Sequence, residues 1–164
     1  MSKSEEYLKE AFAGESQANR KYLAFAAAAD KEGFAQVARL FRAAAEAETV
    51  HAHNHLRVLK GIKSTKENIQ EAVQGETHEF TMMYPEMIKT ADAEGNKDAS
   101  RSFRYANQVE EIHAQLYQKA LSNLDKKESY PYYVCPICGN TFEKEAPEAC
   151  PICGAKRQVF KKID

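Results

Sequence analysis

Two Glu-x-x-His motifs, Glu48–His51 and Glu110–His113, interrupt helical stripes of apolar residues. At a nearly equal spacing before each motif, a single glutamate, Glu15 or Glu76, interrupts another stripe of the same kind. Burying an ionised carboxylate without a partner costs on the order of several kcal/mol, and carboxylates that meet at one level repel one another. A helical core built from these stripes therefore folds only if the glutamates are protonated or if cations lie among them.

The residue types and their spacing favour cations. Positions i and i+3 share one face of a helix, so each motif directs a carboxylate and an imidazole to the same place. A glutamate from each of two helices, with a Glu-x-x-His motif from each of two others, is the ligand pattern of di-iron and di-manganese bundles. Glutamates on solvated helix faces are the simpler alternative. The matched spacing of the two halves argues against it, because chance would have to produce the same pattern twice.

Breaks that contain glycine divide the first part of the chain into four helical segments. Ser64 and Glu67 form a capping-box pattern, which predicts a helix start. We expect helices at about residues 4–29, 34–61, 65–93 and 97–124. Short connections make consecutive helices antiparallel, which predicts an up-down four-helix bundle. The connection near Gly61 leaves one alternative open. If it opened out, helices could be exchanged with a second chain, and the sequence would look the same.

The composition changes sharply near residue 126. Four of the five prolines and all four cysteines lie beyond this point. We therefore expect two domains, residues 1–126 and 131–164, joined by a linker at about Asp125–Tyr130.

Two Cys-x-x-Cys knuckles, Cys135–Cys138 and Cys150–Cys153, each direct two thiolates at one point, and together they complete a tetrahedral four-sulfur site. The glycine after each knuckle permits backbone conformations in which amides approach sulfur. Four sulfurs suit both zinc and iron. A zinc ribbon that only holds this short tail together is therefore the alternative to an iron centre.

Several classes of function are disfavoured. The net charge of −1 lacks the cationic excess that nucleic-acid binding requires. No run reaches the roughly 18 apolar residues of a membrane helix, and the acidic start of the chain has no apolar signal region. We expect a cytoplasmic protein, in which clustered thiols indicate a metal site because disulfides are rare there.

In combination, these features resemble the rubrerythrin family over nearly the whole chain. The resemblance rests on the two Glu-x-x-His motifs with their preceding glutamates, on Glu76-x-x-Glu79 and on the two Cys-Pro-Ile-Cys-Gly knuckles. It implies an all-α, ferritin-like four-helix bundle with a binuclear non-haem iron site, followed by a small rubredoxin-like domain with one iron. The implied ligands are Glu15, Glu48, His51, Glu76, Glu79, Glu110 and His113 for the iron pair, and Cys135, Cys138, Cys150 and Cys153 for the single iron.

The resemblance also implies a role for each bundle ligand. Glu48 and Glu110 would bridge the two irons, and Glu15 and Glu76 would be terminal ligands.

Glu79 breaks the symmetry of the repeat, because the matching place in the first half is Ala18. By resemblance, His113 would hold one iron, while Glu79 and His51 would alternate on the other, with His51 engaged after reduction. The four positive charges of two ferrous ions balance the negative charges of four glutamates. The oxidised pair carries more positive charge and can therefore use a fifth carboxylate.

Two tyrosines are candidates for orienting the ligands. By resemblance, Tyr22 and Tyr84 would donate hydrogen bonds to ligand carboxylates; otherwise they are core aromatics. Among the remaining histidines, His53 and His78 fall off the apolar stripes and are expected to be exposed, and His55 is expected to be structural.

The function that the resemblance implies is the reduction of hydrogen peroxide to water, as in oxidative-stress defence. Electrons would enter through the cysteine-bound iron from rubredoxin or a similar donor with its NAD(P)H reductase, and the family implies a homodimer. Two other interpretations remain: an iron-oxidising or iron-storing protein like the ferritins, and a non-enzymatic module with a zinc ribbon. The first does not need the cysteine tail, and the second leaves the glutamates in the core unexplained.

Overall fold

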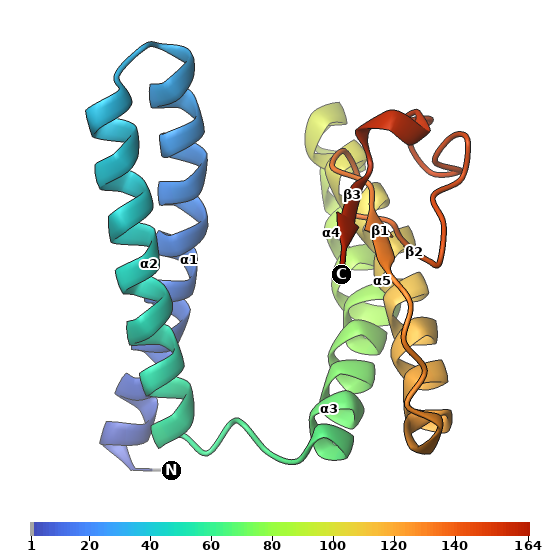
Figure 1. The fold of residues 1–164 in the computed structure, drawn as a ribbon, viewed down its shortest axis with the longest axis horizontal. Coiled ribbons are helices and arrows are strands. Elements are labelled where there is room, and N and C mark those ends of the chain that lie inside the picture. Colours follow the sequence, from blue (N-terminus) through green and yellow to red (C-terminus); the bar gives the residue numbers. More distant parts are fainter. Residues whose placement is uncertain (1) are drawn as a thin grey trace. The chain divides into compact units, whose positions relative to one another are not determined.

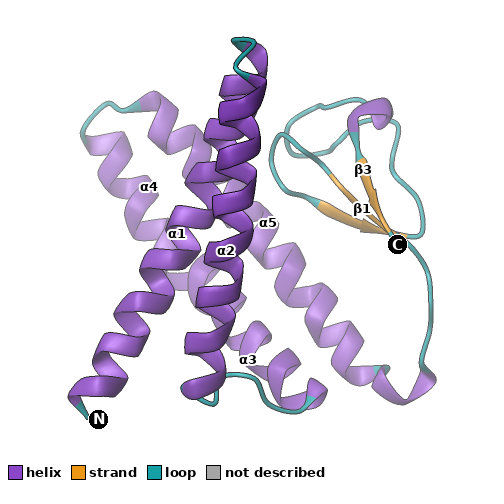
Figure 2. Ribbon diagram, turned by 60° about the vertical axis from the view of Figure 1, so that its left-hand side comes forward, coloured by secondary structure: helices purple, strands orange, loops and turns teal. Residues whose placement is uncertain are grey.

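The computed structural model describes residues 2–164, which divide into two compact units between Lys63 and Ser64. Within this part of the chain, no helix combines the length and hydropathy that a membrane crossing requires. The first unit is a helical hairpin, and the second is a helical hairpin followed by a small sheet (Figures 1 and 2). The expected domain boundary near residue 126 stays a prediction.

The first hairpin consists of α1 (Lys3–Lys31) and α2 (Ala35–Val58). Ser2 begins α1 through a capping box with Glu5. The predicted end of the second helix at residue 61 is wrong, because α2 ends at Val58. Lys60 has a φ of 56°, and the N–H groups of Lys60 and Gly61 bond back to the Arg57 and Leu56 carbonyls. These bonds form a Schellman motif, which ends the helix.

The second hairpin runs through α3 (Thr65–His78), the π-helical turn η1 (Glu79–Met83), α4 (Tyr84–Ala93) and α5 (Lys97–Ser122). The capping box of Ser64 and Glu67 is confirmed. The single predicted helix 65–93 is interrupted at Glu79, where the Tyr84 N–H bonds to the Glu79 carbonyl. Pro85 explains the interruption, because proline has no N–H and its ring clashes with the carbonyl four residues back.

A three-stranded sheet with the order β2-β1-β3 follows the helices. Its strands β1 (Tyr132–Val134), β2 (Thr141–Glu143) and β3 (Lys161–Ile163) pair in antiparallel fashion. Short 3-10 turns lie at Leu124–Lys126 and Arg157–Val159. The small core of this module consists mainly of cysteines and the Phe142–Phe160 ring pair.

The sheet module contacts α5 directly. Lys119 on α5 forms an ion pair with Glu143 on β2, and Gly139 lies close enough to Val109 that a Cβ there would contact the valine at 3.7 Å. The four-cysteine module and the second hairpin are therefore in contact within one unit.

The first hairpin buries only small side chains between its helices. Ala26, Ala38, Ala45 and Ala52 are buried, whereas Leu40 is 67% exposed. Alanines allow the two helices to approach closely, and the larger apolar residues remain available for another helical layer.

Candidate metal centres

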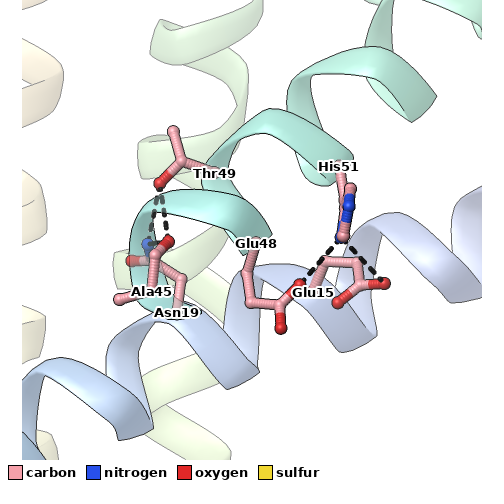
Figure 3. A network of polar contacts seen from close by, with 6 residues as sticks. All are labelled: Glu15, Asn19, Ala45, Glu48, Thr49 and His51. Carbon is pink, nitrogen blue, oxygen red and sulfur yellow. Dashed lines mark hydrogen bonds and ion pairs between the residues drawn. The ribbon is translucent and has the colours of Figure 1, made fainter. Parts of the chain in front are cut away.

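The first hairpin brings Glu15 on α1 together with Glu48 and His51 on α2. Their ligand atoms lie within 4.8 Å of one another, and we call these three residues the first cluster. His51 Nδ1 is 2.9 Å from Glu48 Oε2 and 4.0 Å from Glu15 Oε1 (Figure 3). The imidazole of His51 is 54% exposed.

Asn19 fixes the register of the two helices beside this cluster. Its Nδ2 donates to the Ala45 carbonyl at 2.7 Å and to Thr49 Oγ1 at 2.8 Å (Figure 3). Asn19 lies one turn after Glu15 and Thr49 directly follows Glu48, so these bonds hold the two carboxylates at one level. This role of Asn19 was not predicted from the sequence, in which its only signal is a polar residue within an apolar stripe.

The second hairpin forms a matching cluster from Glu76 on α3 and Glu110 and His113 on α5, which we call the second cluster. His113 Nδ1 is 2.8 Å from Glu110 Oε2 and 3.8 Å from Glu76 Oε1. The His113 side chain is only 26% exposed. Burial, together with the nearby charges of Glu110 and Glu79, raises the pKa of Glu76 to about 7.

Glu79 begins the π-helical turn and lies beside the second cluster without being one of its three members. Burial, followed by repulsion from Glu110, raises the pKa of Glu79. π-helical turns within α-helices occur frequently at functional sites. The turn at Glu79 therefore marks the half of the chain in which the fifth carboxylate lies.

The two tyrosines lie in different surroundings. Burial, and then the charges of Glu110 and Glu79, raise the pKa of Tyr84. The Tyr22 ring instead packs against Phe25 and Phe41, with centroids 6.4 and 6.1 Å away. Neither hydroxyl has a hydrogen-bond partner among residues 2–164, so their predicted roles stay predictions.

The remaining histidines lie outside both clusters. His53 and His78 are exposed, and His55 is half-buried on α2.

The four cysteines converge on one point. All are free thiols, and their sulfur atoms lie within 4.8 Å of one another. The sulfur pairs Cys135–Cys153 and Cys138–Cys150 are each 3.5 Å apart. Burial by itself would raise the pKa of Cys150, but backbone N–H groups of Cys153 and Ile152 donate to its sulfur and lower the pKa to about 7.

The glycines after the knuckles have left-handed backbone conformations. Gly139 and Gly154 have φ values of 87° and 76°, and their N–H groups bond to the Cys135 and Cys150 carbonyls. These left-handed conformations close each knuckle at little steric cost.

The donor chemistry fits metals at both places. In each histidine cluster a ring nitrogen faces carboxylate oxygens, an arrangement that needs a proton or a cation between them. Oxygen and imidazole donors suit iron, and four thiolates suit tetrahedral iron or zinc. The Glu and His residues and the four-cysteine knuckle thus fit a binuclear iron and a rubredoxin-like iron. Fold and sites define a helical carboxylate–histidine metal protein with a four-cysteine module.

Comparison with known proteins identifies the family. The rubrerythrin family model matches residues 6–121, and the model of the rubrerythrin rubredoxin-like domain matches residues 133–161. The chain belongs to the rubrerythrin family. Rubrerythrin-2 of Clostridium acetobutylicum is 36% identical over 95% of this chain and 94% of its own length. Nigerythrin of Nitratidesulfovibrio vulgaris is 36% identical over 94% of this chain and 84% of its own.

Solved structures agree with this assignment. A mixed-valent nigerythrin, 35% identical, matches with a TM-score of 0.60 over 99% of this chain and 88% of its own. The family match and this structure confirm the expected all-α, ferritin-like fold class with a rubredoxin-like C-terminal domain. The chain is therefore a di-iron protein of the oxidative-stress type, with an oxidoreductase-like character.

Proposed function

We propose that the chain is a non-haem di-iron peroxidase that reduces hydrogen peroxide to water. The observation that carries the proposal is the presence of two Glu, Glu, His clusters and a four-cysteine site on one chain. A site that only stores iron has no need of a one-electron centre. A peroxidase does, because its metal pair has to be reduced again after every turnover.

We assign the bundle ligands as the family pattern suggests. Glu48 and Glu110 would bridge the two ions, and Glu15 and Glu76 would be terminal ligands. By this pattern each cluster would supply one bridging glutamate, one terminal glutamate and one histidine.

Glu79 and His51 are the candidates for exchange on one ion, with His113 as the constant ligand of the other. Burial and Glu110 disfavour the ionised form of Glu79, as the raised pKa of Glu79 indicates. Extra positive charge offsets this penalty. Glu79 would therefore be a ligand of the oxidised pair, and His51, which is 54% exposed, would take its place after reduction.

The chemistry of the bound pair is the delivery of two electrons to the O–O bond, in the balance H2O2 + 2 e⁻ + 2 H⁺ → 2 H2O. The protein binds the peroxide and supplies protons. Tyr84 keeps its hydroxyl protonated, because burial and the nearby glutamates raise its pKa. Tyr84 is thus the candidate hydrogen-bond donor at the second cluster, and Tyr22 is the corresponding candidate at the first.

Electrons enter through the iron held by Cys135, Cys138, Cys150 and Cys153. Ile137, within the first knuckle, is 63% exposed, and an exposed apolar side chain beside a redox centre suits a transient protein contact. The proposed donor is rubredoxin or a similar small redox protein with its NAD(P)H reductase. Four free thiols at one point fit a reducing, cytoplasmic compartment.

We further propose a homodimer. Leu40 and Val58 on the first hairpin are 67% and 65% exposed, and another helical hairpin would cover such apolar side chains. That hairpin belongs either to the same chain or, if the helices are exchanged, to the second copy.

The test is a single-turnover experiment. Iron-loaded protein is reduced without oxygen, hydrogen peroxide is added, and the colour of the cysteine-bound ferric iron is followed. Rapid return of colour, with two electrons consumed per peroxide, is the expected result. A coloured but peroxide-inert protein that instead takes up and oxidises added ferrous iron would overturn the proposal in favour of iron storage.

A further inference from the structure

His113 has a second polar partner, which comes from the C-terminal module. Its Nε2 lies 3.0 Å from the hydroxyl oxygen of Thr141 on β2. His113 is on α5, and the two residues are 28 positions apart in the sequence. The ring is therefore held from both sides, by carboxylates at Nδ1 and by a hydroxyl at Nε2.

The direction of this hydrogen bond follows from the other partner of Thr141. The Thr141 hydroxyl has one proton, and it donates this proton to the Gly139 carbonyl at 3.1 Å. Thr141 consequently accepts from His113, so the hydrogen of the imidazole is on Nε2. The lone pair on Nδ1 then faces Glu110 and Glu76, where a metal ion would bind.

Packing alone does not hold the ring in this orientation. His113, Glu76, Thr141 and Tyr132 line a cavity of about 480 Å³ between the helices and the sheet module. An imidazole at the wall of an open cavity has space to turn. The hydrogen bond to Thr141 is therefore the contact that selects one orientation and one tautomer.

The histidine of the first cluster has no such hydrogen bond among the described residues. Among the described residues, Nε2 of His51 has no hydrogen-bond partner, and the ring is 54% exposed. The contacts of His51 therefore do not favour the Nε2–H tautomer over the Nδ1–H tautomer, in which Nδ1 would donate to Glu48.

We propose that Thr141 is a positioning residue that holds His113 as the Nε2–H tautomer and keeps Nδ1 free for the metal. The proposal rests on the proposed function only in taking His113 as a ligand. Removing the hydrogen-bond partner of a metal-ligating histidine typically lowers metal affinity by about 10- to 100-fold. Because Gly139 directly follows Cys138, the rubredoxin-like module itself supplies this support.

The experiment uses the full-length protein loaded with zinc, which is diamagnetic. Proton–nitrogen spectra of the histidine rings report which nitrogen carries hydrogen, and competition with a chelator measures zinc affinity. Thr141→Val removes the hydroxyl and keeps the shape and the strand preference, whereas Thr141→Ser keeps the hydroxyl. Thr90→Val is the matched control, because the Thr90 hydroxyl bonds only to Glu86 of its own helix.

We expect wild type, Thr141→Ser and Thr90→Val to show His113 bound through Nδ1 with a slowly exchanging Nε2–H. In Thr141→Val we expect fast exchange, mixed binding modes and affinity for the weaker zinc sites lowered about 10- to 100-fold. The His51 signals should be the same in all four proteins.

Three outcomes would overturn the proposal. They are histidine spectra and zinc affinity unchanged in Thr141→Val, zinc affinity as low in Thr141→Ser as in Thr141→Val, or a His113 ring with its hydrogen on Nδ1 in the wild type. The last needs no variant, so the proposal is testable even if Thr141→Val fails to fold. Because no step uses peroxide, loss of this role leaves the peroxidase proposal standing. If these tests succeed but the protein does not reduce peroxide, only the proposed function is refuted, and the role of Thr141 stands.

Discussion

The first and second clusters contain the same ligand types at nearly the same distances, but their surroundings differ. The shortest histidine–glutamate distances are 2.9 Å at His51 and 2.8 Å at His113. The His51 side chain is 54% exposed, whereas that of His113 is 26% exposed and has its Nε2 3.0 Å from the Thr141 hydroxyl oxygen. The internal repeat therefore duplicates the donor atoms without duplicating their environment.

The electrostatic surroundings differ in the same direction. The second cluster has Glu79 close to Glu76 and Glu110, whereas the first has Ala18 at the matching position. Burial, and then the charges of Glu110 and Glu79, raise the pKa of Glu76, so ionising this group of carboxylates is costly without metal. The second cluster thus has more carboxylates around its histidine, and its histidine is less exposed than that of the first cluster.

The largest effect should come from removing a bridging glutamate from either half. We expect Glu48→Ala and Glu110→Ala each to lower peroxide turnover by more than about 100-fold, because ligand loss exceeds the effect of losing a ligand's hydrogen-bond partner. Metal analysis should show bundle iron lost to a similar extent in both variants. The exposed neighbours provide matched controls, Glu46→Ala and Glu111→Ala. Full retention of one bundle iron in either variant would indicate two independent sites.

A smaller effect is expected for the fifth carboxylate. Glu79→Ala should slow peroxide turnover about tenfold while iron content is retained, since the remaining ligands still hold both ions. Adding Ala18→Glu in the same protein tests whether the halves are interchangeable. We expect no recovery, because Ala18 lies on a regular helix and Glu79 begins a π-helical turn. Recovery of the rate would show that the turn is dispensable.

The third prediction concerns the stability of the metal-free protein. The pKa of Glu76 is about 7 when folded against an ordinary value of 4.5, so between these pH values the folded state binds more protons than the unfolded state. The contribution of Glu76 is therefore fully present below about pH 4.5 and is lost as pH rises through 7. Glu76→Gln should raise Tm relative to wild type by a few degrees at pH 8 and by less at pH 5.

Thermal unfolding followed by circular dichroism measures both proteins across this range, and Glu15→Gln provides the reference curve for the first cluster. Parallel curves of Tm against pH for wild type and Glu76→Gln would count against an unfavourable environment for the Glu76 carboxylate in the second cluster.

The smallest effect should separate the two tyrosines. Tyr84→Phe should lower peroxide turnover about threefold, in the range of one lost hydrogen bond. Tyr22→Phe should have less effect, because the Tyr22 ring packs against Phe25 and Phe41. Turnover and Tm measured together separate a chemical role from a packing role. Equal losses of turnover in both variants would remove this difference between the halves.

Local signals predicted much of the fold. The capping box at Ser64 and the left-handed glycines after the knuckles were predictable because they depend on residues only a few positions apart. The π-helical turn was not predicted, although Pro85 was its visible signal. The early end of α2 was also missed, because it requires a lysine, Lys60, in a conformation that usually favours glycine.

The sequence by itself determined which side chains are available as ligands and that the two halves repeat. Helical periodicity is enough for this, because residues three or four apart share a face. Only the tertiary structure decided which histidine is supported. The Thr141–His113 and Asn19–Ala45 bonds join residues 28 and 26 positions apart. Such contacts depend on how helices and strands pack, and no local pattern encodes them.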